Sequence, residues 1–427
     1  MFRRVIVKMR RMQESTRASI GIDSPGMRRA GRDALSVALM DARNHSLHLF
    51  GILGSRLEAG GFAVPQAPDV NPPLWELGHI GWFQEWWITR NTRRLSGLAC
   101  GSQPPRLASV EAQADTWWSD ALVPHAARWS AGLPDFARTR DYLLGTLETT
   151  LELLDKAADS DAALYCFRLA LFHEDLHGEA LITLAQTLGL AMPLAVPGPQ
   201  APREPLRVNA SRWQLGLTAE SGFCFDNECQ AHDVDVPEFE IDAQVVCWAQ
   251  YVEFVDDGGY DRPELWHADG WAWLQQQAQG NRGRAPRYVD QIGVASGAVM
   301  QTRFGTARRM LGGQPVTHVT WWEADAWCRW AGRRLPAEVE WELAAYTAMR
   351  RGFRWGDVWE WTGSTARAYP GFVAGPWHTY SEPAFGSHKV LRGASFATRE
   401  RVKHPKFRRF ALPGRDELFA GFRSCAV

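Results

Sequence analysis

Apolar side chains recur at helical spacing through the first half of the chain. Between residues 34 and 58 they fall every three or four positions, and the pattern ends at Gly60-Gly61. Three further segments follow the same spacing, at about 74–87 (after Pro72-Pro73), 137–157 and 161–189. Four helices of this length, joined by mixed loops, predict a four-helix bundle over residues 34–191.

The pattern changes beyond this bundle. Residues 192–205 contain prolines at positions 193, 197, 199, 202 and 205, which cannot continue a helix and therefore indicate a linker. In residues 206–427, short extended segments at 239–246 and 389–392 alternate with short helices at 248–256 and 321–331. The expected fold class is therefore α + (α+β), a helical bundle followed by an irregular α+β domain.

A basic segment precedes the bundle. Residues 1–33 begin with a stretch that has a single acid among its first 17 positions and six basic side chains, Arg3, Arg4, Lys8, Arg10, Arg11 and Arg17. No apolar core with a cleavage site follows, so the stretch does not read as a signal peptide. We expect a disordered tail, or residues added by an upstream start.

Charge and length exclude several classes of partner. The chain has 427 residues, 47 Lys and Arg against 48 Asp and Glu, and a formal net charge of −1. This balance predicts neither a nucleic-acid nor a membrane-surface partner, and no window approaches the roughly 18 apolar residues of a membrane span. We expect a cytoplasmic protein that acts on small molecules. The sequence leaves its oligomeric state open.

Two residue types stand out in the composition. Seven cysteines are scattered, and the one close pair, Cys224 and Cys229, fits no common zinc motif. We therefore expect reduced thiols. The 21 tryptophans exceed ordinary usage, so aromatic side chains are available to line a pocket for a cation or a flat heterocycle.

The most specific chemical pattern is a histidine pair on the fourth predicted helix. His173 and His177 are four residues apart, so they project from one face of the helix and can reach one metal ion. Leu169, Phe172 and Leu176 surround them and predict that this face is buried. The alternative is a pair of core histidines without metal.

A third ligand decides between classes of metal site. The string His173-Glu174-x-x-His177 is also the HExxH pattern of zinc hydrolases, in which the Glu is a general base. Downstream of His177 the next histidine lies beyond the linker, whereas His79 lies on the second predicted helix of the same bundle. Three histidines leave metal positions open for substrate and O2, as in non-haem Fe(II) enzymes, although zinc remains chemically possible.

The motifs as a set resemble a known family. Trp75-x3-His79-Ile80-Gly81 and His173-Glu174-x2-His177 resemble the DinB-like iron domain of the ergothioneine-type sulfoxide synthases. The second half resembles the formylglycine-generating-enzyme-like (C-type-lectin-like) domain fused to it. The strings that carry this second resemblance are Pro315-Val316-Thr317-His318-Val319-Thr320-Trp321, Arg334-Leu335-Pro336-Ala337-Glu338, Val358-Trp359-Glu360-Trp361-Thr362, Val390-Leu391-Arg392-Gly393 and Ala420-Gly421-Phe422-Arg423.

The resemblance implies a function and a ligand set. Members of this family use Fe(II) and O2 to attach sulfur or selenium to the imidazole of hercynine, the betaine of histidine. It implies His79, His173 and His177 as iron ligands. Holding the imidazole, the donor atom and O2 at one metal would supply the proximity that this reaction needs. A zinc hydrolase and a non-catalytic binding module remain as alternatives.

The sequence departs from the family where the donor substrate binds. Family members that use cysteine or γ-glutamylcysteine hold it with two arginines and an aspartate; the matching positions here are His125, Arg128 and Ala411. The family's catalytic tyrosine corresponds to Trp377, three positions before Tyr380-Ser381. These changes favour the selenoneine synthase branch, whose donor is an uncharged selenosugar, over a sulfoxide synthase that takes a thiol.

Aromatic side chains near these positions are candidates for the trimethylammonium group of hercynine. We expect Trp377 and Tyr380 at the catalytic site. For substrate binding we expect Tyr380, Arg409, Phe410, Ala411, His125 and Arg128.

Overall fold

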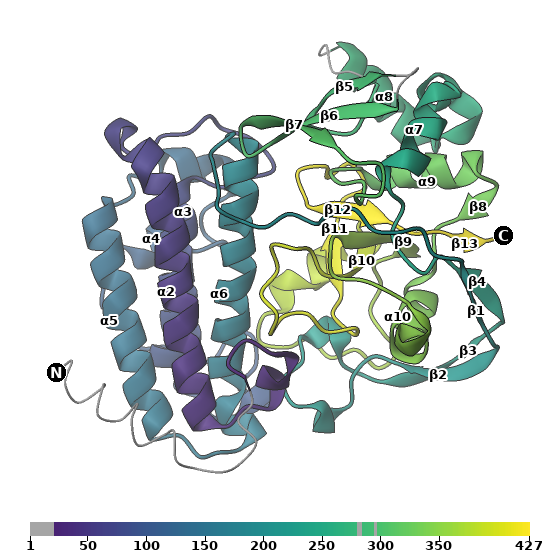
Figure 1. The fold of residues 1–427 in the computed structure, drawn as a ribbon. Helices are drawn as coiled ribbons and strands as arrows, with labels where there is room; N and C mark the ends of the chain where they lie inside the picture. Colours follow the sequence, from purple (N-terminus) through teal and green to yellow (C-terminus); the bar gives the residue numbers. More distant parts are fainter. Residues whose placement is uncertain (1–20, 280–283, 294–296) are drawn as a thin grey trace.

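Two differently built halves lie side by side in the computed structural model, which describes residues 21–279, 284–293 and 297–427 (Figure 1). The N-terminal half is the expected helical bundle. Its long helices are α2 (Arg32–Leu57), α3 (Pro73–Gln84), α5 (Phe136–Asp155) and α6 (Asp161–Thr187), with a short α4 (Ala114–Trp118) between α3 and α5. A π-helical segment, Glu85–Thr89, continues α3.

Local sequence explains where three of these helices begin. The Ser160 hydroxyl accepts a hydrogen bond from the Ala163 N–H at the start of α6, and the Asp135 carboxylate accepts one from the Arg138 N–H at the start of α5. Proline at the first position of α3 suits its fixed φ angle and needs no hydrogen-bond partner for an N–H.

The C-terminal half is an α+β domain of short elements. Its helices are α7 (Trp248–Asp256), α8 (Ala268–Gln279), α9 (Trp321–Trp330) and α10 (Glu338–Thr347). Its strands are β1 (Leu206–Val208), β2 (Ser211–Leu215), β3 (His232–Val236), β4 (Phe239–Ile241), β5 (Val289–Gly293), β6 (Ala298–Arg303), β7 (Thr306–Met310), β8 (Arg333–Arg334), β9 (Trp359–Thr365), β10 (Lys389–Gly393), β11 (Arg409–Ala411), β12 (Ala420–Phe422) and β13 (Cys425–Ala426).

Among the described residues these strands form four small sheets. Their strand orders are β1-β4-β13-β8, β11-β10-β9-β12, β2-β3 and β5-β6-β7. The β11-β10-β9-β12 sheet is antiparallel except for the parallel pair β12 and β9. The segment expected to be extended at 239–246 is a strand only over its first three residues.

Helix α6 joins the two halves through buried polar contacts. Glu179 accepts hydrogen bonds from the indole N–H of Trp359 on β9 at 2.7 Å and from Thr398 at 2.7 Å. One helical turn earlier, Asp175 pairs with Arg401, with the Nε and Oδ2 atoms 2.6 Å apart. Because all of these groups are buried, their contacts fix α6 against the C-terminal domain.

Part of the segment expected to be a tail belongs to the fold. Residues 1–20 lie outside the described residues, but residues 25–29 form a short 3-10 helix in which Met27 and Arg28 are buried. Arg28 forms a two-pronged ion pair with Glu228 in the C-terminal domain. The tail prediction is wrong here because a partner 200 positions away leaves no local pattern.

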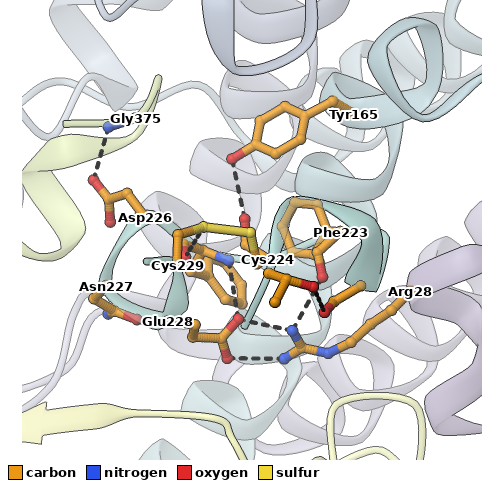
Figure 2. Close-up of a disulfide and its surroundings, with 12 residues drawn as sticks. Arg28, Tyr165, Phe223, Cys224, Asp226, Asn227, Glu228, Cys229 and Gly375 are labelled. Carbon is orange, nitrogen blue, oxygen red and sulfur yellow. Dashed lines mark hydrogen bonds and ion pairs between the residues drawn. A yellow bond between two sulfur atoms is a disulfide. The ribbon is translucent and has the colours of Figure 1, made fainter. Parts of the chain in front are cut away.

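The expectation of reduced thiols is wrong for one pair. Cys224 and Cys229 form a disulfide, while Cys100, Cys166, Cys247, Cys328 and Cys425 are free. The Cys224–Cys229 disulfide closes a tight loop that also holds Asp226 and Glu228 (Figure 2). None of the helices described is long and apolar enough to cross a membrane.

Candidate metal centre

Three histidines converge where α3 and α6 pack together. Nitrogens of His79, His173 and His177 all lie within 4.8 Å of one another. The Nε2 atoms of His79 and His173 are 3.3 Å apart. His173 is fully buried, His79 is 3% exposed, and the His177 side chain is 17% exposed, so the group is open on the His177 side.

Two of the imidazoles are oriented through the nitrogen that faces away from the centre. The Nδ1 atom of His79 lies 2.7 Å from the Trp118 carbonyl oxygen, and Nδ1 of His177 lies 2.5 Å from the Glu76 carboxylate. Both acceptors require a proton on Nδ1, which leaves Nε2 with a free lone pair. A carboxylate or carbonyl behind a ligating histidine is the usual supporting arrangement of a metal site.

Burial keeps the inner two imidazoles neutral. It lowers the pKa of His79 to about 4 and the pKa of His173 well below the ordinary value. The buried Nδ1 atom of His173 has no hydrogen-bond partner, and its Nε2 faces the Nε2 lone pair of His79 across 3.3 Å. With the His173 proton on Nδ1, both Nε2 lone pairs can bind one cation. The donor set and its geometry therefore fit a divalent metal ion.

Close packing around α3 sets the position of His79. The ring stacks on Trp75 and Trp82, with centroid distances of 4.6 and 5.4 Å. A Cβ atom at Gly78 would lie only 2.0 Å from the Trp118 indole nitrogen. Glycine at this position thus lets Trp118 come close enough for its carbonyl to hold His79.

A chain of polar groups leads from His177 to Arg128. Glu76 accepts from His177 through Oε1, and its Oε2 accepts from the Asn71 side-chain amide at 2.6 Å. The Asn71 carbonyl oxygen in turn accepts from Arg128 Nη1 at 2.6 Å. The Arg128 guanidinium lies over Trp75, 3.7 Å from the ring centroid. Arg128 is therefore tied to the support of a histidine.

One cavity borders the histidines, and a second is separated from them by Phe83 and Trp377, which contact His173; residues of both domains line each cavity. The first, of about 190 Å³, reaches His177 and is lined by Asp69, Asn71, Glu76, Thr183, Arg409, Arg415 and Glu417, among others. The second, of about 200 Å³, is lined by Trp82, Phe83, Trp86, Trp87, Asp120 and Trp377, among others. One cavity is thus polar and the other aromatic with an acidic group.

Trp377 lies beside the histidines, and Tyr380 packs on Trp377. The Trp377 ring makes edge contacts with both His173 and Phe83 at 5.0 Å, and Phe83 stacks on His173 at 3.5 Å. Tyr380 stacks on Trp377 at 4.6 Å, and burial raises the pKa of its hydroxyl. Of the two aromatic residues expected at the catalytic site, Trp377 therefore contacts a histidine directly, and Tyr380 supports Trp377.

The remaining candidates divide between the polar cavity and other surroundings. Arg409 lines the cavity and pairs with Glu179 at 3.0 Å, whereas Ala411 is buried on the same strand, β11. His125 lies one layer behind the cavity, with Nε2 2.9 Å from the Val70 carbonyl oxygen. Phe410 packs instead against Phe385 in a separate cluster, so the structure does not bring it to the histidines.

Sequence reasoning missed the residues that support the histidines. Glu76 lies three positions before His79 on the same helix face, so it was within the recognised Trp75-x3-His79 string. Asn71 and the Trp118 carbonyl carried no comparable signal. Glu174, the acid of the HExxH string, has both carboxylate oxygens bound by Arg43, so it is not free to act as a general base.

Comparisons with known proteins agree with this architecture. Residues 34–185 match the DinB superfamily, and residues 195–357 match the sulfatase-modifying factor enzyme 1-like domain. The hercynine oxygenase of Mycolicibacterium thermoresistibile is 30% identical over 92% of this chain and 94% of its own length.

Two further relatives carry the same name. The hercynine oxygenase of Mycolicibacterium smegmatis is 30% identical over 92% of this chain and 98% of its own length. That of Mycobacterium tuberculosis is 31% identical over 83% of this chain and 91% of its own length. With both domains present in the same order and the similarity spanning nearly the full chain, this protein belongs to the hercynine oxygenase family of ergothioneine-type sulfoxide synthases.

Proposed function

We propose that this chain is a non-haem Fe(II)- and O2-dependent enzyme that forms a carbon–chalcogen bond on the imidazole of hercynine. His79, His173 and His177 would hold the metal, and a bound Fe(II) would supply the activation of O2. The observation that carries this proposal is the convergence of these three imidazoles at the edge of a cavity, in a chain of the hercynine oxygenase family.

The aromatic cavity suits a quaternary ammonium group. Trp82, Trp86 and Trp377 offer π faces or edges, and Asp120 adds a negative charge on the same wall. A trimethylammonium group cannot donate a hydrogen bond, so aromatic faces and a nearby carboxylate are the partners available to it. We therefore assign the trimethylammonium group of hercynine to this cavity, whose lining residues Phe83 and Trp377 contact His173.

The polar cavity favours an uncharged donor. A selenosugar is uncharged, whereas γ-glutamylcysteine carries charged groups. Its charged side chains already have partners: Arg409 pairs with Glu179, Arg415 with Glu417, Asp69 with Arg287 and Glu76 with His177. A zwitterionic thiol would have to break one of these pairs, whereas sugar hydroxyls can hydrogen-bond to them as they stand. We therefore propose C–Se bond formation from a selenosugar.

The second candidate is a sulfoxide synthase that uses cysteine or γ-glutamylcysteine. Arg409 and Arg415 line the polar cavity and favour it, because either could hold a carboxylate after exchanging partners. The zinc hydrolase has less support, since Arg43 holds the Glu174 carboxylate that such an enzyme would need as a base.

Product analysis tests the proposal. The protein is reconstituted anaerobically with Fe(II), then exposed to O2 with hercynine and either a selenosugar or γ-glutamylcysteine, and products are identified by mass spectrometry. Selenoneine formed from the selenosugar alone supports the proposal. A sulfoxide from the thiol would assign the chain to the second candidate. No product from either donor, with zinc bound in the purified protein, would refute both.

A further inference from the structure

The segment that carries Trp377 and Tyr380 is held at both ends by one buried carboxylate. Asp226 is 4% exposed; its Oδ2 accepts from the Gly375 backbone N–H at 3.0 Å and its Oδ1 accepts from the Ser381 hydroxyl. Figure 2 shows the first of these contacts reaching across from the disulfide loop. Asp226 therefore anchors the segment 375–381 at its first and last residues.

Asp226 is itself fixed by the loop in which it lies. The Cys224–Cys229 disulfide closes this loop covalently, as seen in Figure 2. Inside it, the Glu228 carboxylate accepts from the Phe225 N–H at 3.0 Å and pairs with Arg28, while Arg408 donates to the Asn227 carbonyl oxygen at 2.7 Å. A carboxylate held on both sides in this way has little freedom to follow a moving partner.

The same loop contacts the aromatic segment directly. The Phe225 ring lies 5.4 Å from Tyr380 and 6.2 Å from Trp377, measured between centroids. Trp377 in turn contacts His173 at 5.0 Å. A continuous set of contacts thus runs from the disulfide loop to the histidine centre.

We propose that Asp226 is a positioning residue for Trp377, and that the Cys224–Cys229 disulfide maintains this position. Without either, residues 375–381 lose their anchors, and Trp377 no longer keeps its place against His173 and the aromatic cavity. The consequence for turnover rests on the proposed function, whereas the consequence for the mobility of residues 375–381 does not.

Opening the loop needs a reductant. A water-soluble phosphine cleaves the S–S bond of Cys224–Cys229: the bond takes two electrons, each sulfur gains a proton, and the phosphine becomes a phosphine oxide with oxygen from water. Cys229 is half-buried, whereas Cys224 is buried, so we expect the phosphine to attack at Cys229.

Hydrogen exchange measured by mass spectrometry on the full-length, iron-loaded protein tests the positioning directly. In Asp226→Ala we expect amide exchange in residues 375–381 to rise by about tenfold, because Gly375 loses a charge-assisted hydrogen bond. Phosphine treatment of the wild type should give a rise in the same segment. The matched control is Asp233→Ala, an acid in a surface ion pair of the same domain, which should leave this segment unchanged.

Two further variants keep the test decisive. Ser381→Ala removes one of the two anchors, so exchange in residues 375–381 should rise less than in Asp226→Ala. This variant provides the test if Asp226→Ala folds poorly. The double variant Cys224→Ser/Cys229→Ser should exchange like the reduced wild type and should not respond to phosphine. Unchanged exchange in residues 375–381 on reduction and in Ser381→Ala would overturn the proposal.

Kinetics then separate positioning from general damage. Asp226→Ala should raise the KM for hercynine several-fold while the affinity for the metal stays within about twofold, since the carboxylate and carbonyl that support the histidines do not contact Asp226. A parallel loss of metal affinity would mean that the variant is generally unfolded, and this result would also overturn the proposed positioning role of Asp226. If the wild type turns over no hercynine, the proposed function fails while the exchange result still decides the positioning role.

Discussion

Replacing Glu76 with Gln should weaken metal binding without changing any of the three histidines. In the native protein one carboxylate oxygen accepts from His177 and the other accepts from Asn71. In the variant, Oε1 can still accept from His177, but the new amide nitrogen then faces the Asn71 amide nitrogen. Turning the Asn71 side chain over only moves this clash, because its oxygen already accepts from Arg128.

The size of the effect follows from burial. Glu76 is 2% exposed, so water cannot replace the lost partner. An unsatisfied buried polar group costs about 1–3 kcal/mol, which corresponds to about 5- to 150-fold in a dissociation constant. Loss of a group that supports a ligating histidine costs about 10- to 100-fold in metal affinity. The two estimates agree on a Kd for Fe(II) or Co(II) raised by about 10- to 100-fold.

A compensating variant makes the reasoning refutable. The double variant Asn71→Asp/Glu76→Gln restores a donor opposite every acceptor, because the new carboxylate at position 71 can accept both from the new amide at position 76 and from Arg128. Metal affinity, measured by competition with a chelator, should recover most of the loss. Glu152→Gln on the exposed face of α5 is the control and should bind metal normally. A double variant that binds no better than Glu76→Gln would refute the hydrogen-bond argument.

Three further predictions concern other contacts. Gly78→Ala would put a Cβ atom 2.0 Å from the Trp118 indole and should destabilise the fold by about 1–3 kcal/mol, measured by chemical denaturation. Arg28→Met should cost about 3–5 kcal/mol because it leaves Glu228 buried and unpaired; an unfolding midpoint equal to that of the wild type would contradict this. Trp377→Ala should raise the hercynine KM several-fold at unchanged metal affinity, and an unaltered KM would remove Trp377 from the substrate pocket.

The sequence predicted the bundle well because its signals are local. Helical periodicity and caps depend on residues three or four positions apart, and the observed helices begin and end within two residues of the expected bounds except for the end of α3, whose last turns are π-helical. The pairing of His173 with His177 follows from the same spacing. His79 joined them because the chain offers no closer downstream histidine and because it lies on another predicted helix of the same bundle.

Contacts between distant segments were not predictable in the same way. Glu179 and Trp359 are 180 positions apart, and nothing in either neighbourhood indicates the other. The placing of Phe410 failed for a different reason: successive residues of β11 point to opposite faces, so Arg409 can line the cavity only if Phe410 points away from it. Because β11 is only three residues long, its sequence does not show which residues face the cavity.

The buried carboxylates of α6 limit how this family can be recombined. Asp175 depends on Arg401, and Glu179 depends on Arg409, Trp359 and Thr398, all of which come from the second domain. A chimaera that combines this bundle with a second domain lacking those four side chains would leave two negative charges buried without partners. Exchanging the second domain of this chain therefore also requires matching contacts on α6, the helix that carries His173 and His177.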